Sequence, residues 1–599
     1  MSFESELERT TRDIAALCRR SFGPCGEETL VFCPPEAPIV TGEGHAVLAA
    51  WKRGLNADDP LAKLLLNAAN GVHQQLGDGS SEFILLVDAA VRNAGEKLRR
   101  EHGVDRSRLS RAFGELKWEL QRQMQTLQSH LNGLQVLVPI ELDDRTMQPS
   151  KQFREASDNI LKSALHGVLG DQSVEFVVDL ALTWVFSTFK RSNAAERVDK
   201  VLFKRVQQYL KCAPDAIIFM AAPSVYASYV VPRDEFILKK SVVASQPLGI
   251  LDRCQGSVRF VCFTCTLSLS AGSNHVELAT TTDDELFTTQ DAAHLFISKY
   301  IHNLRHSLQI QLVVSTEALA ESVIAACTRQ DIACVQLAEP DDVDALCISA
   351  AIFPLASVFD DVRMIEHVGV CANGVSRVRF QQQALVPQLL VHAPTKGVYK
   401  QYYASIVKCL RVLRSWWEPM PSELDCLLHD QQPAIARSCR GGGATEVAIA
   451  RWLLDESEKN PSGTQTQDPV MLCLARKTFA NAIIEVVSAL RNNLCQTGIH
   501  DEGPTSNKNV ASQRQVLLDA FSYLKINDQQ AEKCHGYILD YSRVLETLAG
   551  PIQIPELVVD DPAKYGLLHP WRRIDTLLFL TLQTLEQLFR IDGLHICHT

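Results

Sequence analysis

Helical patterns fill both ends of this 599-residue chain, and a section of a different kind separates them. In four N-terminal segments apolar residues recur at three- and four-residue intervals, which predicts amphipathic helices over Glu4 to Arg20, Pro60 to Gln75, Ser81 to Arg100 and Arg106 to Leu131. The C-terminal part repeats the pattern in Ala444 to Leu454, Val470 to Arg491, Arg514 to Ile526 and Ile574 to Phe589. The two ends therefore look alike, and the middle looks inserted.

The middle section begins near Cys212, where β-branched and aromatic residues become frequent. Leu308 to Ser315 and Ile332 to Ala338 predict strands, and a helical pattern follows each of them. Strands that alternate with helices are typical of a parallel sheet covered by helices. The sequence therefore predicts an α/β domain here, within a chain expected to form about three or four domains.

The net charge of −11 and the absence of basic runs interleaved with aromatic residues make nucleic acid an unexpected partner. The N-terminal residues Met1 to Glu8 are acidic and polar, which is not the pattern of a secretory signal. The longest nearly uncharged stretch, Ala216 to Val231, contains Pro223 and is too short to span a bilayer. We therefore expect a cytoplasmic protein without membrane insertion.

The 18 cysteines are scattered and are expected to be reduced, mostly buried thiols. Cys262 and Cys265 form a Cys-x-x-Cys pair in a β-rich run, where this spacing sends the side chains to opposite faces and disfavours zinc. A flexible tail is favoured over a metal site for the C-terminal group of His595, Cys597 and His598. Common hydrolase and Walker-type NTPase motifs are absent from the sequence.

A turn of sequence Gly-Asp-Gly-Ser-Ser, Gly77 to Ser81, directly precedes one of the predicted helices. Glycines there let backbone N–H groups approach an anion, the helix N-terminus adds a favourable dipole, and Asp78 has the chemistry to hold Mg²⁺ against phosphates. The same residues also suit an ordinary turn with a good helix cap. The turn by itself leaves these two interpretations open.

Several segments with glycine, proline or charged residues at fixed places occur in a set order at both ends of the chain. In the N-terminal half they are Ser21 to Pro24, Ile39 to Leu48, Asp59 to Lys63 and Gly77 to Ser81. In the C-terminal half they are Gly441 to Glu446, Phe479 to Ala482, the Asp561, Gly566 and Pro570 set, and Phe589 to Asp592. In this order, around an α/β insertion, they resemble segments of the group II chaperonins of the TCP-1/cpn60 superfamily, and Gly77 to Ser81 resembles the family's Gly-Asp-Gly-Thr-Thr.

The resemblance implies a multi-domain α+β and α/β fold in which loops from both chain halves meet at one nucleotide. The implied domains are equatorial (1–149 and 426–599), intermediate (150–205 and 371–425) and apical (206–370). The implied cofactor is ATP with Mg²⁺, the metal on Asp78. The implied nucleotide-binding residues are Gly23, Pro24, Gly44, Gly77, Asp78, Gly79, Ser80, Ser81, Gly442, Gly443 and Asp561.

The chain departs from the family at the carboxylates that the family uses for hydrolysis. Its first Asp is replaced by Glu43, Asp78 is kept, and the stretch Gln401 to Trp417, where the third should lie, has no acidic residue. The intermediate-domain segment His166 to Asp171 has also diverged. Because loss of a residue that orients the attacking water costs orders of magnitude in rate, we predict ATP binding without hydrolysis and name no catalytic residue.

Such divergence resembles the chaperonin-like proteins linked to Bardet-Biedl syndrome, which act with the cytosolic chaperonin in assembling the BBSome for cilia. The resemblance implies cytosolic chaperonin subunits, BBSome-type clients and other chaperonin-like proteins as partners, a location at the ciliary base or centrosome, and client contact through Ser257 to Pro354. Two alternatives remain: an ATP-hydrolysing ring subunit in which Glu418 replaces the missing carboxylate, and a nucleotide-free scaffold with relic glycine turns.

Overall fold

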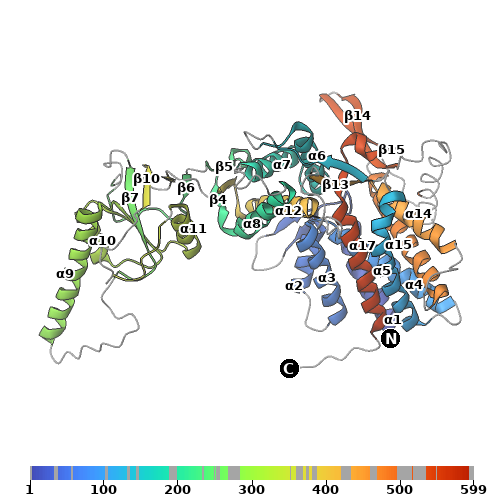
Figure 1. Ribbon diagram of the computed structural model, residues 1–599, viewed down its shortest axis with the longest axis horizontal. Coiled ribbons are helices and arrows are strands. Elements are labelled where there is room, and N and C mark those ends of the chain that lie inside the picture. Colours follow the sequence, from blue (N-terminus) through green and yellow to red (C-terminus); the bar gives the residue numbers. More distant parts are fainter. Residues whose placement is uncertain are drawn as a thin grey trace, which may run out of the picture. The chain divides into compact units, whose positions relative to one another are not determined.

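The computed structural model describes residues 3–32, 38–54, 59–100, 105–130, 135–142, 148–187, 198–232, 235–247, 250, 257–267, 283–350, 352–358, 369–372, 377–380, 387–419, 434–458, 468–495, 516, 535–547 and 550–591. The chain forms two compact units, which we call the helical unit (Met1–Leu210 with Thr395–Thr599) and the sheet unit (Lys211–Pro394). Figure 1 labels many of the elements of both units and colours the chain from its N-terminus to its C-terminus. The helical unit thus contains both ends of the chain, and the sheet unit is inserted between them in the sequence.

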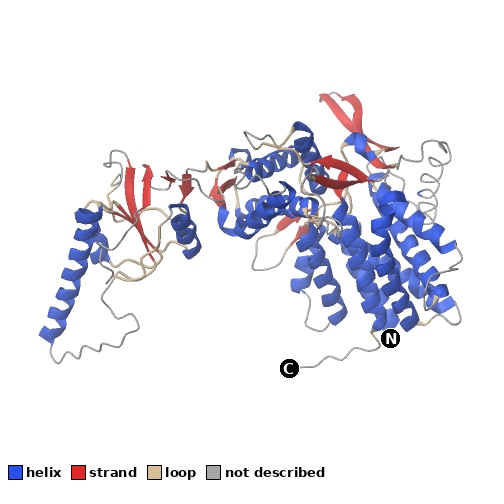
Figure 2. Ribbon diagram, in the orientation of Figure 1, coloured by secondary structure: helices blue, strands red, loops and turns tan. Residues whose placement is uncertain are grey.

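A bundle of long helices from both chain ends forms the core of the helical unit. Its helices are α1 (Phe3–Arg19), α2 (Gly44–Gly54), α3 (Pro60–Leu76), α4 (Ser80–Arg100), α5 (Arg106–His130), α14 (Ala444–Glu458), α15 (Pro469–Cys495) and α17 (Trp571–Arg590). One continuous hydrophobic cluster includes Phe83, Phe113, Phe479 and Leu585, so the N- and C-terminal halves share a single core. The bundle is the large group of blue helices in Figure 2.

Ion pairs reinforce this joining of distant segments. Lys117 Nζ on α5 lies 2.7 Å from Glu586 Oε2 on α17, and Arg476 on α15 pairs with Glu119 on α5. These partners are 469 and 357 residues apart in sequence. Each pair is partly buried, so water screens it less than an exposed pair.

A second group of helices contains α6 (Lys151–Leu165), α7 (Asp171–Phe186) and α12 (Lys396–Trp417), and α12 contacts α3 and α17 of the bundle. Tyr209 of α8 (Val198–Ala216) packs on Trp184 of α7. Trp416 and Trp417 at the end of α12 are buried and lie 5.7 and 5.8 Å, between ring centroids, from Phe153 of α6. The Trp416 indole N–H also donates to Ser438 Oγ at 2.9 Å. The two tryptophans therefore fix α12 against its neighbours.

Small antiparallel sheets complete the helical unit. Strands β1 (Thr29–Val31) and β2 (Ile39–Thr41) pair with each other, and β13 (Ile435–Arg440) lies between β3 (Gln135–Pro139) and β16 (Leu568–Pro570). Strands β14 (Gly536–Thr547) and β15 (Gly550–Asp560) form a long hairpin. The three-stranded sheet pairs β3, from the N-terminal part of the chain, with β13, which also pairs with β16. This sheet therefore also connects the two ends of the chain.

The sheet unit is built on a six-stranded sheet of order β6-β11-β10-β7-β8-β9. These strands are β6 (Glu235–Ile237), β7 (Ser257–Phe263), β8 (Leu312–Ser315), β9 (Ala333–Val335), β10 (Gly369–Ala372) and β11 (Arg377–Phe380). Helices α9 (Asp283–Leu308) and α10 (Glu321–Arg329) pack on one face and α11 (Pro340–Ala350) packs on the other. A separate three-stranded sheet contains β4 (Ile217–Ala221), β12 (Leu389–Ala393) and β5 (Tyr229–Val230).

The parallel pairing of β7 with β8 and of β8 with β9 confirms the predicted α/β pattern. The predicted start of the first strand at Leu308 was wrong, because α9 continues to Leu308 and β8 begins only at Leu312. Between them Gln309 adopts φ +57°, a left-handed turn that ends the helix. Cys262 and Cys265 contribute to the hydrophobic clusters on opposite sides of the sheet, as predicted.

Two of the sequence predictions fall outside the described residues: the helix over Arg514 to Ile526, apart from Val516, and the His595, Cys597 and His598 group. Within the described part of the chain, every helix is too short or too polar to cross a membrane.

Candidate functional site

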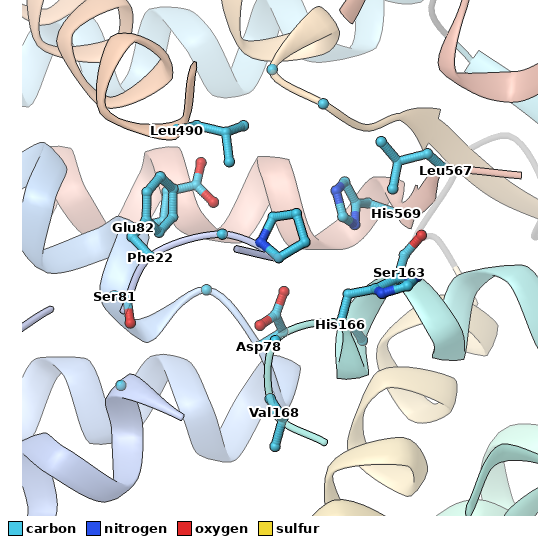
Figure 3. A pocket seen from close by; sticks show the side chains of 18 of the residues that line it. Phe22, Asp78, Ser81, Glu82, Ser163, His166, Val168, Leu490, Leu567 and His569 are labelled. Carbon is cyan, nitrogen blue, oxygen red and sulfur yellow. The ribbon is translucent and has the colours of Figure 1, made fainter. Parts of the chain in front are cut away.

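A cavity of about 510 Å³ lies inside the helical unit where turns from both chain halves converge. Its wall includes the loop after α1, the α3–α4 turn, the end of α6, the middle of α12, and the glycine turn before α14. Figure 3 shows Leu490 and Leu567 above Asp78 and Val168 around this space. The chain therefore builds the cavity only when its two ends have folded together.

Nearly all of the predicted nucleotide-binding residues line this cavity: Gly23, Pro24, Gly44, Gly77, Asp78, Gly79, Ser80, Ser81, Gly442 and Gly443. Asp561 does not line the cavity. It caps the N-terminus of the short 3-10 helix Pro562–Tyr565, where its Oδ1 accepts a hydrogen bond from the Ala563 N–H. The same oxygen lies 2.8 Å from Arg440 Nε. The structure thus gives Asp561 a role in holding β13 and this turn together.

Gly77 is required by the way α12 packs on the α3–α4 turn. It ends α3 at φ +77°, and its N–H donates to His73 O at 2.8 Å. A Cβ at this position would lie 2.7 Å from Arg411 Cβ and 2.9 Å from the Lys408 carbonyl oxygen. The turn can therefore meet α12 only with glycine at this position, whether or not a ligand binds.

Asp78 is held between two cations. Its Oδ1 lies 3.5 Å from Lys408 Nζ on α12, and its Oδ2 accepts from Arg573 Nε on α17 at 3.0 Å. Burial by itself would raise the pKa of Asp78, but the two cations outweigh it and hold the pKa well below its usual range. Asp78 is therefore a permanently charged, doubly paired carboxylate.

Arg573 connects a group of buried carboxylates beside the cavity. Besides Asp78 it donates to Glu82, and its Nη1 lies 3.8 Å from Glu446 Oε1. Burial, followed by the neighbouring Glu82, raises the pKa of Glu446 to about 7. Burial also raises the pKa of Glu82 despite the contact with Arg573. One guanidinium thus faces three acids, and the pKa of two of them is raised.

The raised pKa of Glu446 predicts a pH-dependent stability that glutamine removes. A carboxyl whose pKa is raised in the folded protein stabilises the fold below its unfolded pKa and loses that contribution as pH rises through the folded pKa. We expect Glu446→Gln to unfold at higher urea concentration than wild type at about pH 8, and at nearly the same concentration at about pH 5. Asp455→Asn, an exposed change on the same helix, should keep the wild-type pH profile. Parallel profiles for wild type and Glu446→Gln would contradict this assignment.

Lys408 lines the cavity and was not among the predicted site residues. It lies within the segment where the family resemblance puts its third carboxylate, and its side chain is only 6% exposed. Its Nζ is 3.9 Å from Glu43 Oε1 as well as 3.5 Å from Asp78 Oδ1. Burial raises the pKa of Glu43, and Lys408 opposes that rise. The sequence showed that α12 has no acidic residue. It could not show which residue of α12 faces the cavity, because that depends on how the helix packs.

Glu418 does not supply a substitute carboxylate. It caps the C-terminal end of α12, and its Oε2 lies 3.4 Å from Arg572 Nε, away from the residues that line the cavity. The alternative in which Glu418 orients an attacking water is therefore not supported by its position.

The residues around Asp78 do not fit the Mg²⁺ ion expected there. Magnesium binds to free carboxylate oxygens in near-octahedral geometry, whereas both Asp78 oxygens face cations. Among the described residues no three His, Cys, Asp or Glu side chains are grouped as metal ligands. Magnesium on Asp78 therefore stays a prediction, and the two cations beside Asp78 do not favour it.

The cavity histidines are neutral, so they add no charge. His45 and His73 stack at 3.6 Å between ring centroids, and burial with nearby cations lowers the pKa of His45 to about 4 and that of His73 to about 2. Burial also lowers the pKa of His569 to about 3. The positive charge on the cavity wall therefore comes from Lys408 and Arg573.

The rest of the wall is largely apolar and includes Phe22, Pro24, Val168, Leu490 and Leu567. A cavity with apolar walls and a few converging charged groups is typical of a small-ligand site. The arrangement suits a molecule with an apolar planar part and an anionic part, which describes a nucleoside phosphate.

Comparison with known proteins shows similarity to a protein family and to a relative within it. The model of the TCP-1/cpn60 chaperonin family matches residues 14–500 of this chain. T-complex protein 1 subunit delta of Candida glabrata is 26% identical over 196 residues, which are 33% of this chain and 32% of that protein. This alignment therefore spans about a third of the relative's length, whereas the family model covers most of the chain.

Proposed function

Because this chain belongs to the TCP-1/cpn60 chaperonin family, we propose that it is a chaperonin-like protein that assists folding or assembly of other proteins and binds a nucleotide without hydrolysing it. The observation that supports nucleotide binding without hydrolysis is the contact of Lys408 with both Glu43 and Asp78. The nucleotide site is the cavity of the helical unit, and the predicted division into equatorial, intermediate and apical domains is part of the proposal.

The chemistry of an ammonium group supports the absence of hydrolysis. Hydrolysis of the terminal phosphoanhydride bond of ATP needs a hydrogen-bond acceptor that orients the attacking water. A protonated lysine has three hydrogen-bond donors and no acceptor. Asp78 and the buried Lys408 raise each other's preference for the charged form, so the pKa of Lys408 is raised despite its burial. Lys408 therefore stays protonated and cannot serve as a general base.

The finer assignment rests on resemblance. Chaperonin-like proteins linked to Bardet-Biedl syndrome, and the type 10 protein most of all, combine kept glycine turns with lost hydrolytic groups. We assign this chain the same role: BBSome assembly together with cytosolic chaperonin subunits and other chaperonin-like proteins, at the ciliary base or centrosome. Clients are assigned to residues 257–354 of the sheet unit.

Nucleotide binding and turnover by the purified protein test the site. We expect ATP and ADP to bind in titration calorimetry and phosphate release to stay at the level of buffer. Ser163→Trp, which places a large ring on the cavity wall, should abolish binding, while Glu155→Trp on the exposed part of the same helix should not. Turnover at the rate of ring chaperonins would overturn the non-hydrolytic assignment. Absence of binding by the wild type would favour the nucleotide-free scaffold.

Affinity capture from ciliated cells tests the finer assignment. The proposal predicts that ring chaperonin subunits and BBSome components are recovered with the tagged protein. Recovery of neither would remove the ciliary role and leave the general chaperone role in place.

A further inference from the structure

We propose that the Lys408 ammonium takes the place of a divalent cation in the cavity, so that a nucleoside di- or triphosphate binds there directly and without magnesium. This inference rests on the proposed function, because it concerns the ligand of the same cavity. It concerns a different property, however, since a nucleotide site can exist with or without a metal requirement.

The position of Lys408 carries the inference. A cation lying between two carboxylates is the arrangement that a magnesium ion would adopt at this point, and the ammonium already lies between Glu43 Oε1 and Asp78 Oδ1. Arg573 Nε takes the other oxygen of Asp78 at 3.0 Å. A metal ion would have to compete with the ammonium at Asp78 Oδ1 and with the guanidinium at Asp78 Oδ2.

The helix that carries Lys408 is fixed in place next to this turn. Arg414, a turn and a half further along α12, donates to the carbonyl oxygens of Gln74 and Gln75 at 2.6 and 2.7 Å. Those carbonyls belong to the last turn of α3, where cations are favoured. With Gly77 packed against Arg411, α12 has little freedom to withdraw the ammonium from the two carboxylates.

Acids and cations both line the cavity wall. Five carboxyl groups line it, Glu43, Asp78, Glu82, Glu446 and Asp540, together with Lys408 and Arg573. Burial raises the pKa of each of the three glutamates, whereas Lys408 and Arg573 hold the pKa of Asp78 well below its usual range.

The histidines that line the same wall, His45, His73, His166 and His569, have lowered pKa values and are neutral near pH 7. The cationic groups on the wall that an anionic ligand can meet are therefore Lys408 and Arg573. Lys408 supplies beside Asp78 the positive charge that magnesium would otherwise supply.

The test is the affinity of the full-length protein for ADP and ATP, measured by titration calorimetry with EDTA and with magnesium. The proposal predicts dissociation constants that agree within about twofold under the two conditions. Lys408→Asp, which removes the ammonium and adds a carboxylate beside Asp78 and Glu43, should make binding depend on magnesium by about tenfold or more. Lys408→Met should weaken binding equally under both conditions.

Lys400→Met on the exposed part of the same helix is the matched control and should bind as the wild type does. Circular dichroism of each variant checks that it is folded, and Lys408→Met keeps the test valid if Lys408→Asp does not fold. Wild-type binding that requires magnesium would overturn this inference and leave the proposed nucleotide site standing. Absence of wild-type binding under both conditions would overturn the nucleotide site and this inference with it.

Discussion

Replacing Arg573 by methionine is expected to lower the free energy of unfolding of the helical unit by about 3–5 kcal/mol, the cost typical of leaving buried charges without their partner. The guanidinium contacts Asp78 and Glu82 and lies 3.8 Å from Glu446, and its side chain is 9% exposed. Methionine has a similar length, so the loss is that of charge and hydrogen bonds more than of packing. Removal of this one group leaves three carboxyls facing one another.

Urea denaturation followed by tryptophan fluorescence measures this effect on the helical unit alone. All 7 tryptophans, Trp51, Trp118, Trp184, Trp416, Trp417, Trp452 and Trp571, belong to that unit. The matched control is Arg572→Met on the same helix. The Arg572 side chain is 34% exposed and pairs with Glu418 and Asp575, so its loss should cost no more than about 1 kcal/mol.

Neutralising the carboxyls that Arg573 serves should partly rescue the variant. We expect the triple variant Arg573→Met, Glu82→Gln, Glu446→Gln to have a higher free energy of unfolding than the sum of the separate effects of the changes gives. The reason is that the glutamines remove the repulsion between the carboxyls. Equal costs for Arg573→Met and Arg572→Met would show that the buried network contributes little to stability.

Gly77→Ala should lower the free energy of unfolding by about 2–4 kcal/mol, which combines a left-handed backbone with a steric clash. The residue has φ +77°, and an added Cβ would meet Arg411 Cβ at 2.7 Å and the Lys408 carbonyl at 2.9 Å. Since the first of these is a Cβ and the second a backbone atom, neither can move aside as a side-chain tip would. We also expect faster hydrogen exchange in α12, because the clash forces it away from the turn.

Gly71→Ala provides the control within the same helix. A Cβ there meets nothing within 4 Å, and alanine is the better residue inside a helix. That change should stabilise the helical unit by up to about 1 kcal/mol. The assignment of Gly77 to close packing fails if both alanine variants show similar stability in the same urea titration.

Much of the fold followed from local patterns. The predicted helices over residues 4–20, 60–75 and 81–100 are confirmed as α1, α3 and α4 to within one residue at each end. The family model confirms the chaperonin superfamily, and with it the predicted multi-domain α+β and α/β fold. Apolar periodicity and glycine turns are local signals, so a single sequence carries them.

Other elements lacked such signals. The hairpin of β14 and β15 was not predicted, because its pairing depends on contacts across two long strands. Helices α6, α7 and α8 were also missed as individual elements. The five-segment domain division remains a prediction, although the structure places one compact unit at residues 211–394.

By itself, the sequence determined which residues could form a phosphate-type turn and that α12 carries no acid. Tertiary structure alone decided what those facts mean for the site. Asp78 meets Arg573 across 495 residues of chain, and it meets Lys408 because Trp416, Trp417 and Gly77 set how α12 docks. The physical reason is that helix periodicity is a property of neighbours in sequence, whereas the partner of a buried charge is chosen by packing between distant segments.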